Sequence, residues 1–194
     1  MQGLPRATAQ ERIAQGCEQL GLAGELERPP DGRTLYVSNE EDGALGVIDV
    51  ASGKRLKSVA VGEEPEGVKV SPDGKRVYVT SEVANMVHVV DAASGEIVKN
   101  IVVPKRPRRL VFTPDGSELW VTNELGASVT VISTRDLAIT HTVKFELEGM
   151  RPDDISPVGL AMRRARCWSA NAPGASRCRA TARACTWPTG CRTT

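Results

Sequence analysis

Several features of membrane and nucleic-acid-binding proteins are missing from this sequence of 194 residues. It contains no run of 18 or more apolar residues, which excludes a transmembrane helix. Its first thirty residues lack the continuous apolar core of a secretory signal. The formal charge is only +1, from 25 basic and 24 acidic residues, so the strong basic excess typical of nucleic-acid binders is absent. We therefore predict no membrane span and no nucleic-acid partner.

Residues suited to catalysis are also scarce. His88 and His141 are the only histidines, and the G-x-S-x-G, H-E-x-x-H and P-loop motifs do not occur. His88 lies within a predicted strand, so we interpret it as a packing or surface residue. A metal site that combines His88 with a nearby carboxylate is the alternative, but neither spacing nor ligand number supports it. We predict no catalytic residue, no metal site and no cofactor.

The last part of the chain differs in composition from the rest. Residues 163–194 contain seven Arg, no acidic residue and no Val, Ile, Leu, Phe or Tyr, whereas residues 1–162 carry 18 basic and 24 acidic groups. Four of the five cysteines lie here at spacings of 11, 7 and 6, which include no C-x-x-C pair and give no zinc ribbon. We expect 163–194 to be an unstructured basic tail, translated out of frame from GC-rich DNA. A basic tail that binds nucleic acid or anionic lipid is the alternative.

A repeat of 42 residues organises the middle of the chain. Pro-Asp-Gly occurs at residues 30–32, 72–74 and 114–116. The segments Tyr36–Glu40, Tyr78–Glu82 and Trp120–Glu124 follow in the same register. Self-similarity at a fixed period of this length indicates an array of like structural units that pack against their neighbours.

Each repeat predicts four short β-strands. In the second repeat, Gly67–Ser71 is a brief apolar segment that ends at the Pro-Asp-Gly turn, where Gly accommodates a positive φ. Lys75–Glu82 alternates in polarity, and Met86–Asp91 and Glu96–Val103 supply the third and fourth strands. No segment of the repeat has helical spacing over a useful length. Four-stranded units of about 40–45 residues are typical of β-propeller blades.

The predicted fold is all-β, an incomplete β-propeller with about three four-stranded antiparallel blades within residues 30–162. One sheet cannot bury both of its faces alone, so we predict that Tyr36, Tyr78 and Trp120 pack between neighbouring blades. An aromatic residue that stacks on a ligand is the alternative interpretation. Three blades are fewer than the four to eight of a closed propeller. We expect an open arc that self-associates through exposed apolar blade faces.

The two ends of the repeat region depart from the pattern. Within the atypical N-terminal segment 1–29, the residues Ile13, Cys17 and Leu20 have helical spacing and predict a short amphipathic helix over Ala7–Leu26. Leu26–Pro30 matches the first strand of a repeat poorly, so we expect the first blade to lack its innermost strand. Val158–Met162 has the pattern of the first strand of a further blade.

The repeat motifs resemble the β-propeller family named for a Tyr-Val-Thr-Asn motif, the YVTN repeats, over roughly residues 30–162. Further segments are similar to the branch of this family associated with pyrroloquinoline-quinone-dependent alcohol catabolism: Glu64–Gly67, Thr80–His88, Arg106–Arg108, Lys144–Glu146, Met150–Pro152 and Pro157–Gly159. The resemblance implies an accessory protein of the periplasm, although no signal peptide is visible. It also implies a quinoprotein dehydrogenase system, or another protein, as the partner.

The most informative polar residues are three glutamates that end the second strand of each repeat, Glu40, Glu82 and Glu124. In a propeller, the loops that follow them share one face with the connections between blades. That face would also carry the basic cluster Lys105, Arg106, Arg108 and Arg109. Convergent charges at the mouth of a channel indicate a binding site. The alternative is that each Glu holds its own loop by hydrogen bonds.

These observations lead to two main readings of function. The first is a non-enzymatic repeat protein, an accessory or binding scaffold in quinoprotein-dependent alcohol catabolism. The second is a fragment of a propeller enzyme, such as a lactone hydrolase or a quinoprotein dehydrogenase-like protein, and it rests on analogy of fold alone. We favour the first, because an enzyme of this kind would need a complete ring around a polar or metal-bearing centre.

Overall fold

A computed structural model describes residues 26–29 and 31–162, which belong to one compact unit. The tail 163–194 and nearly all of the helix predicted over Ala7–Leu26 lie outside the described residues. The described part is all-β, apart from one 3₁₀ turn, η1 (Pro152–Asp154). None of its helices is long and apolar enough to cross a membrane.

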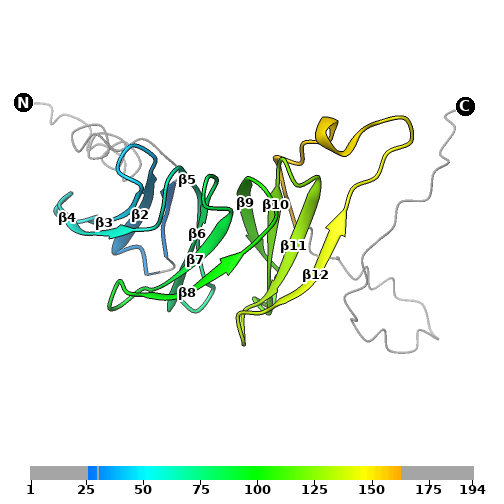
Figure 1. Cartoon of the computed structure of the whole chain (residues 1–194). Coiled ribbons are helices and arrows are strands. Elements are labelled where there is room, and N and C mark those ends of the chain that lie inside the picture. Colours follow the sequence, from blue (N-terminus) through cyan, green and yellow to red (C-terminus); the bar gives the residue numbers. More distant parts are fainter. Residues whose placement is uncertain (1–25, 30, 163–194) are drawn as a thin grey trace, which may run out of the picture. The chain divides into compact units, whose positions relative to one another are not determined.

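Twelve strands form three separate four-stranded antiparallel sheets, in which the spatial order of strands follows the chain (Figure 1). The first sheet contains β1 (Leu26–Glu27), β2 (Thr34–Asn39), β3 (Ala44–Asp49) and β4 (Arg55–Ala60). The second contains β5 (Pro65–Val70), β6 (Arg76–Ser81), β7 (Met86–Asp91) and β8 (Ile97–Val102). The third contains β9 (Pro107–Phe112), β10 (Glu118–Asn123), β11 (Ser128–Ser133) and β12 (Ile139–Lys144). The three predicted blades are confirmed.

The first blade has an innermost strand, contrary to the prediction. Leu26 pairs with Val37, and Glu27 pairs with Tyr36, in antiparallel register. The strand is only two residues long, too short to carry a recognisable apolar alternation. The prediction from Val158–Met162 was also wrong, because this segment forms no strand in the structure. No second strand follows it within the described residues to supply hydrogen-bonding partners for its backbone.

The Pro-Asp-Gly turns close the first hairpin of each blade as predicted. Gly74 and Gly116 have φ of 73° and 71°, a conformation that glycine adopts without steric cost. The Asp before each glycine accepts a hydrogen bond from the backbone N–H two residues further on. At Asp115, hydrogen bonds from the Thr113 and Ser117 side chains and from the Ser117 backbone lower the pKa to about 2. These hydrogen bonds depend on the Asp side chain, which is why the Pro-Asp-Gly sequence favours this turn.

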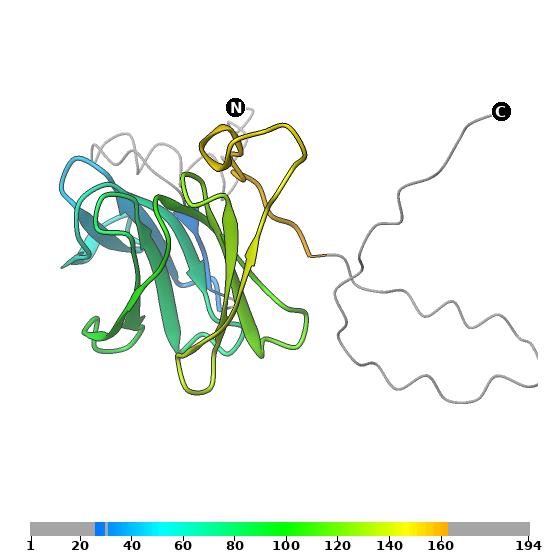
Figure 2. The same ribbon diagram turned by 45° about the vertical axis from the view of Figure 1, so that its right-hand side comes forward.

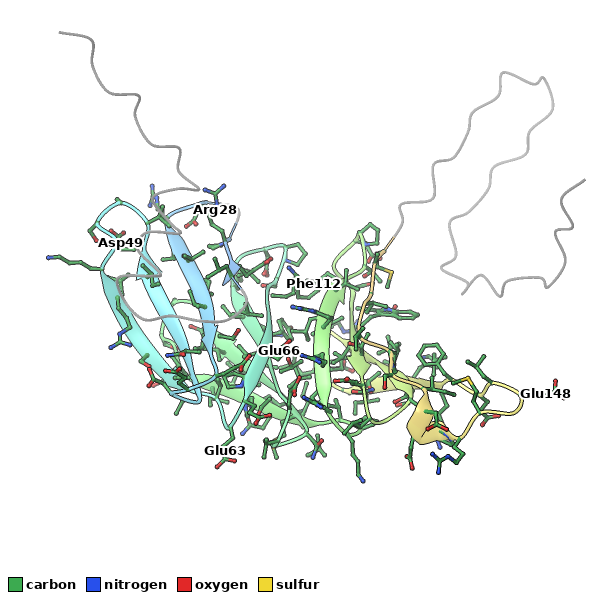
Figure 3. All side chains as sticks on the ribbon, turned by 90° about the horizontal axis from the view of Figure 1, so that it is seen from above. Arg28, Asp49, Glu63, Glu66, Phe112 and Glu148 are labelled. Atoms are coloured by element: carbon green, nitrogen blue, oxygen red, sulfur yellow. The ribbon has the colours of Figure 1, made fainter. Side chains whose placement is uncertain are left out.

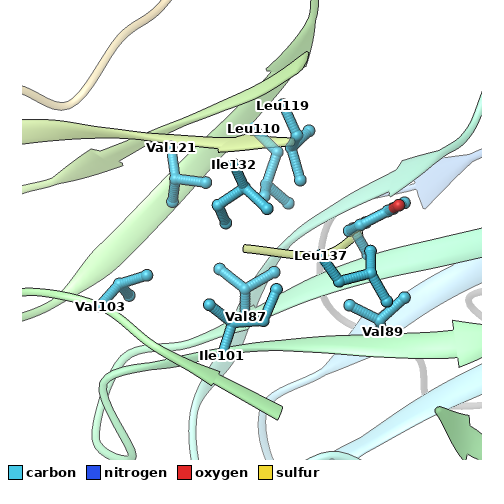
Figure 4. Packing of buried hydrophobic residues seen from close by; sticks show 10 residues of the cluster. Val87, Val89, Ile101, Val103, Leu110, Leu119, Val121, Ile132 and Leu137 are labelled. Carbon is cyan, nitrogen blue, oxygen red and sulfur yellow. The ribbon is translucent and has the colours of Figure 1, made fainter. Parts of the chain in front are cut away.

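Neighbouring blades pack face to face through equivalent apolar positions. Between the second and third blades lies a core of ten buried side chains (Figure 4). Tyr78 belongs to this core and meets the ring of Phe112 edge to face, with centroids 5.4 Å apart. Tyr36, one repeat earlier, packs in the same way into the core between the first and second blades. The predicted packing role is therefore confirmed for both tyrosines, whereas Trp120 lies on the last described blade and is only half-buried.

Hydroxyl groups from the same motif also join the blades. The Ser38 hydroxyl donates to the carbonyl oxygen of Glu66 at 2.7 Å, and the Thr80 hydroxyl donates to that of Arg108 at 2.9 Å. In both pairs the donor is on the second strand of one blade and the acceptor is on the innermost strand of the next. The inner strands of successive blades are neighbours as well, with β1 beside β5 and β5 beside β9. Figure 2 shows the blades from a second direction.

Candidate binding face

The candidate binding face lies where the loops after β2, β6 and β10 meet the connections between blades. Glu40, Glu82 and Glu124 each follow the last residue of one of these strands. The connections bend sharply before the inner strands, because Glu64 and Arg106 have left-handed φ values of 50° and 57°. Their carbonyl oxygens accept hydrogen bonds from the N–H groups of Glu82 and Glu124 at 3.0 and 2.8 Å. Glu82 and Glu124 are thereby held beside the start of the inner strand of their own sheet.

One arginine at the centre of this face, Arg108 on β9, contacts three carboxylates. Its guanidinium nitrogens lie 2.9 Å from Glu66 Oε1, 2.9 Å from Glu82 Oε1 and 3.0 Å from Glu124 Oε2. The Nε atom of Arg106 lies 2.6 Å from Glu82 Oε2 and 3.4 Å from Glu124 Oε2. Glu82 is buried, so these ion pairs offset the loss of its hydration. We call the five residues the Arg108 cluster; its Glu66, on β5, is labelled in Figure 3.

Glu40 joins the Arg108 cluster through Glu66. A hydrogen bond between the two carboxyl groups raises the pKa of Glu40, and burial and the neighbouring acidic charges raise it further. Burial would raise the pKa of Glu66 as well, but the hydrogen bond and positive charge of Arg108 outweigh it, and the pKa is lowered. Of the two carboxyl groups, Glu40 therefore has the higher pKa and is the first to bind a proton as the pH falls.

The structure brings most of the predicted residues together. Together with Glu66, the residues Glu40, Glu82, Glu124, Arg106 and Arg108 form one continuous chain of contacts. Of the other two predicted residues, Arg109 is at the margin, with its guanidinium 3.9 Å from Glu66 Oε1. Lys105 is exposed and makes no ion pair with another described residue.

Sequence reasoning missed Glu66, although a signal for it was present. Glu66 and Arg108 are separated by 42 residues, so they occupy the same position in successive repeats and carry opposite charges. The same relation holds for Glu27 and Lys69, whose Oε2 and Nζ atoms are 2.6 Å apart. Inner strands of adjacent blades place equivalent positions side by side. Opposite charges at one repeat spacing on these strands therefore predict ion pairs between blades.

The functional groups gathered on this face are carboxylates and guanidinium groups. Within residues 26–29 and 31–162, no group of three or more His, Cys, Asp or Glu side chains is placed to hold a metal ion. His88 is buried, with Nδ1 2.8 Å from Asn100 Oδ1. Burial lowers the pKa of His88 against the opposing effect of that hydrogen bond. This neutral, packed imidazole fits the packing role expected from its place in the strand.

Comparison with known proteins points to the same architecture. A model of the family described as YNCE-like beta-propeller matches residues 23–118. Hydrazine synthase of Kuenenia stuttgartiensis is 29% identical, with a TM-score of 0.59 over 60% of this chain and 34% of its own. The structures of the RRP9 WD40 repeats and of U3-55K are each 18% identical, with TM-scores of 0.57 over 64% of this chain and 41% of theirs. Their likeness shows the fold alone.

The chain spans between a third and a half of the length of these structures. No curated protein sequence matches it. The 42-residue repeat, the three four-stranded sheets and the propeller structures that match them agree. The chain is a β-propeller repeat protein.

Proposed function

We propose that this protein is a non-enzymatic scaffold that binds another protein, as a periplasmic accessory to quinoprotein-dependent alcohol catabolism. The link to that system rests on the resemblance of segments such as Glu64–Gly67 and Arg106–Arg108. These segments supply Glu66, Arg106 and Arg108 to the Arg108 cluster. Three residues of the charged face thus lie in segments that carry the resemblance.

The observation that supports binding is the basic rim of this face. Lys105 is exposed, and Arg106 and Arg109 keep 41% and 44% of their side chains accessible. The carboxylates of the Arg108 cluster are more deeply buried and are already paired with arginines, so the basic side chains are the more accessible charges of this face. The rim therefore suits an acidic surface on a partner protein, whose charges would be attracted from solution.

A charge-reversal experiment tests this proposal. The full chain with Lys105→Glu and Arg109→Glu should bind an immobilised quinoprotein alcohol dehydrogenase at least tenfold more weakly, with a weaker dependence on salt. The matched control, Lys54→Glu with Lys75→Glu, makes the same charge change in turns at the opposite ends of the strands. Equal binding by wild type and both variants would contradict the proposal.

The glutamates need a separate test, because they have a structural alternative. The variant Glu40→Gln, Glu82→Gln, Glu124→Gln removes three negative charges but keeps the side-chain shape. Lower thermal stability with unchanged partner binding would assign them to loop support. Weaker binding at unchanged stability would assign them to the binding surface.

The likeness to hydrazine synthase, an enzyme by its name, favours the second reading, a propeller-enzyme fragment. Spectrophotometric titration with pyrroloquinoline quinone and calcium separates the two readings. Saturable binding of the quinone to the full chain would favour the enzyme reading. No spectral change, together with partner capture, would favour the scaffold.

A further inference from the structure

Two exposed apolar side chains lie on the same face as the basic rim. Val83 and Leu125 follow directly after Glu82 and Glu124 and are 50% and 49% exposed. They occupy the same position in successive repeats, in the loops β6–β7 and β10–β11. The proposed function uses only the charges of this face. A single exposed apolar side chain needs no explanation, so the argument depends on how these two lie relative to the basic residues.

The connection between the second and third blades, residues 104–106, lies between the two loops. On the side of the second blade, Asn85 Oδ1 accepts a hydrogen bond from the backbone N–H of Arg106 at 2.9 Å. On the side of the third blade, a Cβ atom on Gly126 would lie only 2.7 Å from the Cβ atom of Pro104. The loops β6–β7 and β10–β11 therefore contact the connection from opposite sides.

The Arg106 side chain also joins the two loops. Its Nε atom lies 2.6 Å from Glu82 Oε2 and 3.4 Å from Glu124 Oε2. Because the next residue after each of these glutamates is apolar and exposed, one apolar residue lies on each side of the guanidinium group. Lys105, beside Arg106, is exposed. We call this surface the mixed patch, which consists of Val83, Lys105, Arg106 and Leu125.

The equivalent surface one repeat earlier has the opposite charge. Three of its four residues are acidic and exposed, namely Glu41, Glu63 and Glu64, and the fourth is Val83 itself. Figure 3 shows Glu63 projecting from the connection between the first and second blades. An acidic segment of a partner is attracted by the mixed patch and repelled by these glutamates, so charge selects one of two equivalent places for it.

We propose that the mixed patch binds a segment of the partner protein that carries both acidic and apolar side chains. This inference rests on the proposed function and specifies the kind of segment that is bound. The carboxylates pair with Lys105 and Arg106, and an apolar side chain packs against Val83 or Leu125, which removes apolar surface from water. A purely acidic segment gains only the ion pairs, which are weak where solvent screens them. The apolar contact supplies the remaining affinity.

Peptide binding to the full chain tests this proposal. The probe is a short synthetic acidic peptide that contains two leucines, and its counterpart has serine at those two positions. Measured by fluorescence anisotropy, the leucine peptide should bind about fivefold more tightly, as expected for partial burial of its apolar surface. Val83→Ser with Leu125→Ser should remove this difference without changing the affinity for the serine peptide. The control Val98→Ser with Val102→Ser, at exposed apolar positions of β8, should leave both affinities unchanged.

The charge requirement has its own matched pair of variants. Lys105→Glu should weaken the binding of both peptides, whereas Glu63→Gln, at the same position one repeat earlier, should weaken neither. Equal affinities of the wild type for the two peptides, no binding of either, or a leucine preference that survives Val83→Ser with Leu125→Ser would overturn the proposal. These results leave the proposed function to the charge-reversal experiment with the dehydrogenase, which decides it separately.

Discussion

Opposite charges at equivalent positions tie the inner strands of neighbouring blades together. Glu27 and Lys69 form one such pair, and Glu66 and Arg108 form another, at 2.6 and 2.9 Å. Their side chains are part-buried, and a fully exposed ion pair would contribute roughly 0–1 kcal/mol. Glu82 differs because it is buried, and its loss of hydration is offset only while Arg106 and Arg108 remain beside it.

Gly67 is required by the close approach of β5 to β9. A Cβ atom at this position would lie 2.1 Å from the carbonyl oxygen of Arg108, which is backbone and cannot rotate away. We expect Gly67→Ala to lower the free energy of unfolding by about 1–3 kcal/mol or more. Gly159→Ala is the control, since nothing lies within 4 Å of its Cβ position, and it should stay within about 0.5 kcal/mol of wild type. Urea denaturation measures both, and equal stability of the two variants would contradict the packing.

The carboxyl pair Glu40–Glu66 makes a distinctive pH dependence. Because the folded-state pKa of Glu40 is raised, its contribution to stability is present below the unfolded pKa, near 4.5, and is lost as the pH rises through the folded value. Glu66 has the opposite sign: its lowered pKa gives stability that is lost as the pH falls below 4.5. Since Glu40 is exposed, we expect Glu40→Gln to stabilise the protein at pH 7 by only about 0.5 kcal/mol or less. Thermal melts of both proteins from pH 3 to 8 measure this, and parallel curves would refute it.

The blade is the repeating unit of this protein. How much a side chain contributes to stability depends on whether a neighbouring blade covers it. β4 and β8 each bury one residue, Val59 and Ile101, under the following blade. β12 has the same length and pairing, but all of its residues are exposed. A strand of this kind is therefore stabilised less by its own sequence than by the sheet that covers it.

Tyr78 and Trp120 test this dependence, because they share a repeat position in different surroundings. Tyr78→Ala removes a fully buried ring between two blades and should cost about 3–5 kcal/mol. Trp120→Ala removes a larger side chain that is only half-buried, and it should cost less than half as much. Chemical denaturation measures both values. A cost for Trp120→Ala as large as that for Tyr78→Ala would show that the last blade is covered as fully as the second.

At the scale of the whole molecule, structural features that recur every 42 residues were predicted from the sequence, and features that depart from the repeat were not. The 42-residue period gave the three blades, and the alternation around Tyr36 and Tyr78 gave the packing between them. The short β1 escaped prediction because two residues hold no periodicity, although pairing with β2 is enough to form it. Val158–Met162 was wrongly predicted as a strand, because it has the composition of a strand but no described strand to pair with.

The candidate site was predictable in part for the same reason. The glutamates recur with the period, and the basic cluster is continuous in sequence, so both were found. Glu66 was overlooked because the equivalent residue of the next repeat is Arg108, which carries the opposite charge. How far each charge is paired internally depends on distances between strands of different blades, which no local pattern reports.

The exposed face of the last described blade predicts self-association. Val143 and Phe145 occupy positions that a following blade would cover, and apolar surface of this kind promotes contact between molecules. Val143→Ser with Phe145→Ser should shift the sedimentation profile toward monomer at a given concentration. Val98→Ser with Val102→Ser, at still more exposed positions of β8, should leave the profile unchanged. An identical profile for wild type and both variants would refute the prediction.

The central claim is that successive blades pack on each other through equivalent side chains, and a double-mutant cycle across one blade boundary tests it most directly. Tyr78 on β6 and Phe112 on β9 meet only if the second and third sheets are stacked. Measured by urea denaturation of Tyr78→Leu, Phe112→Leu and the double variant, the coupling free energy should be about 0.5–1.5 kcal/mol. A coupling of zero, with both single variants folded, would mean that the two blades are not packed together as described.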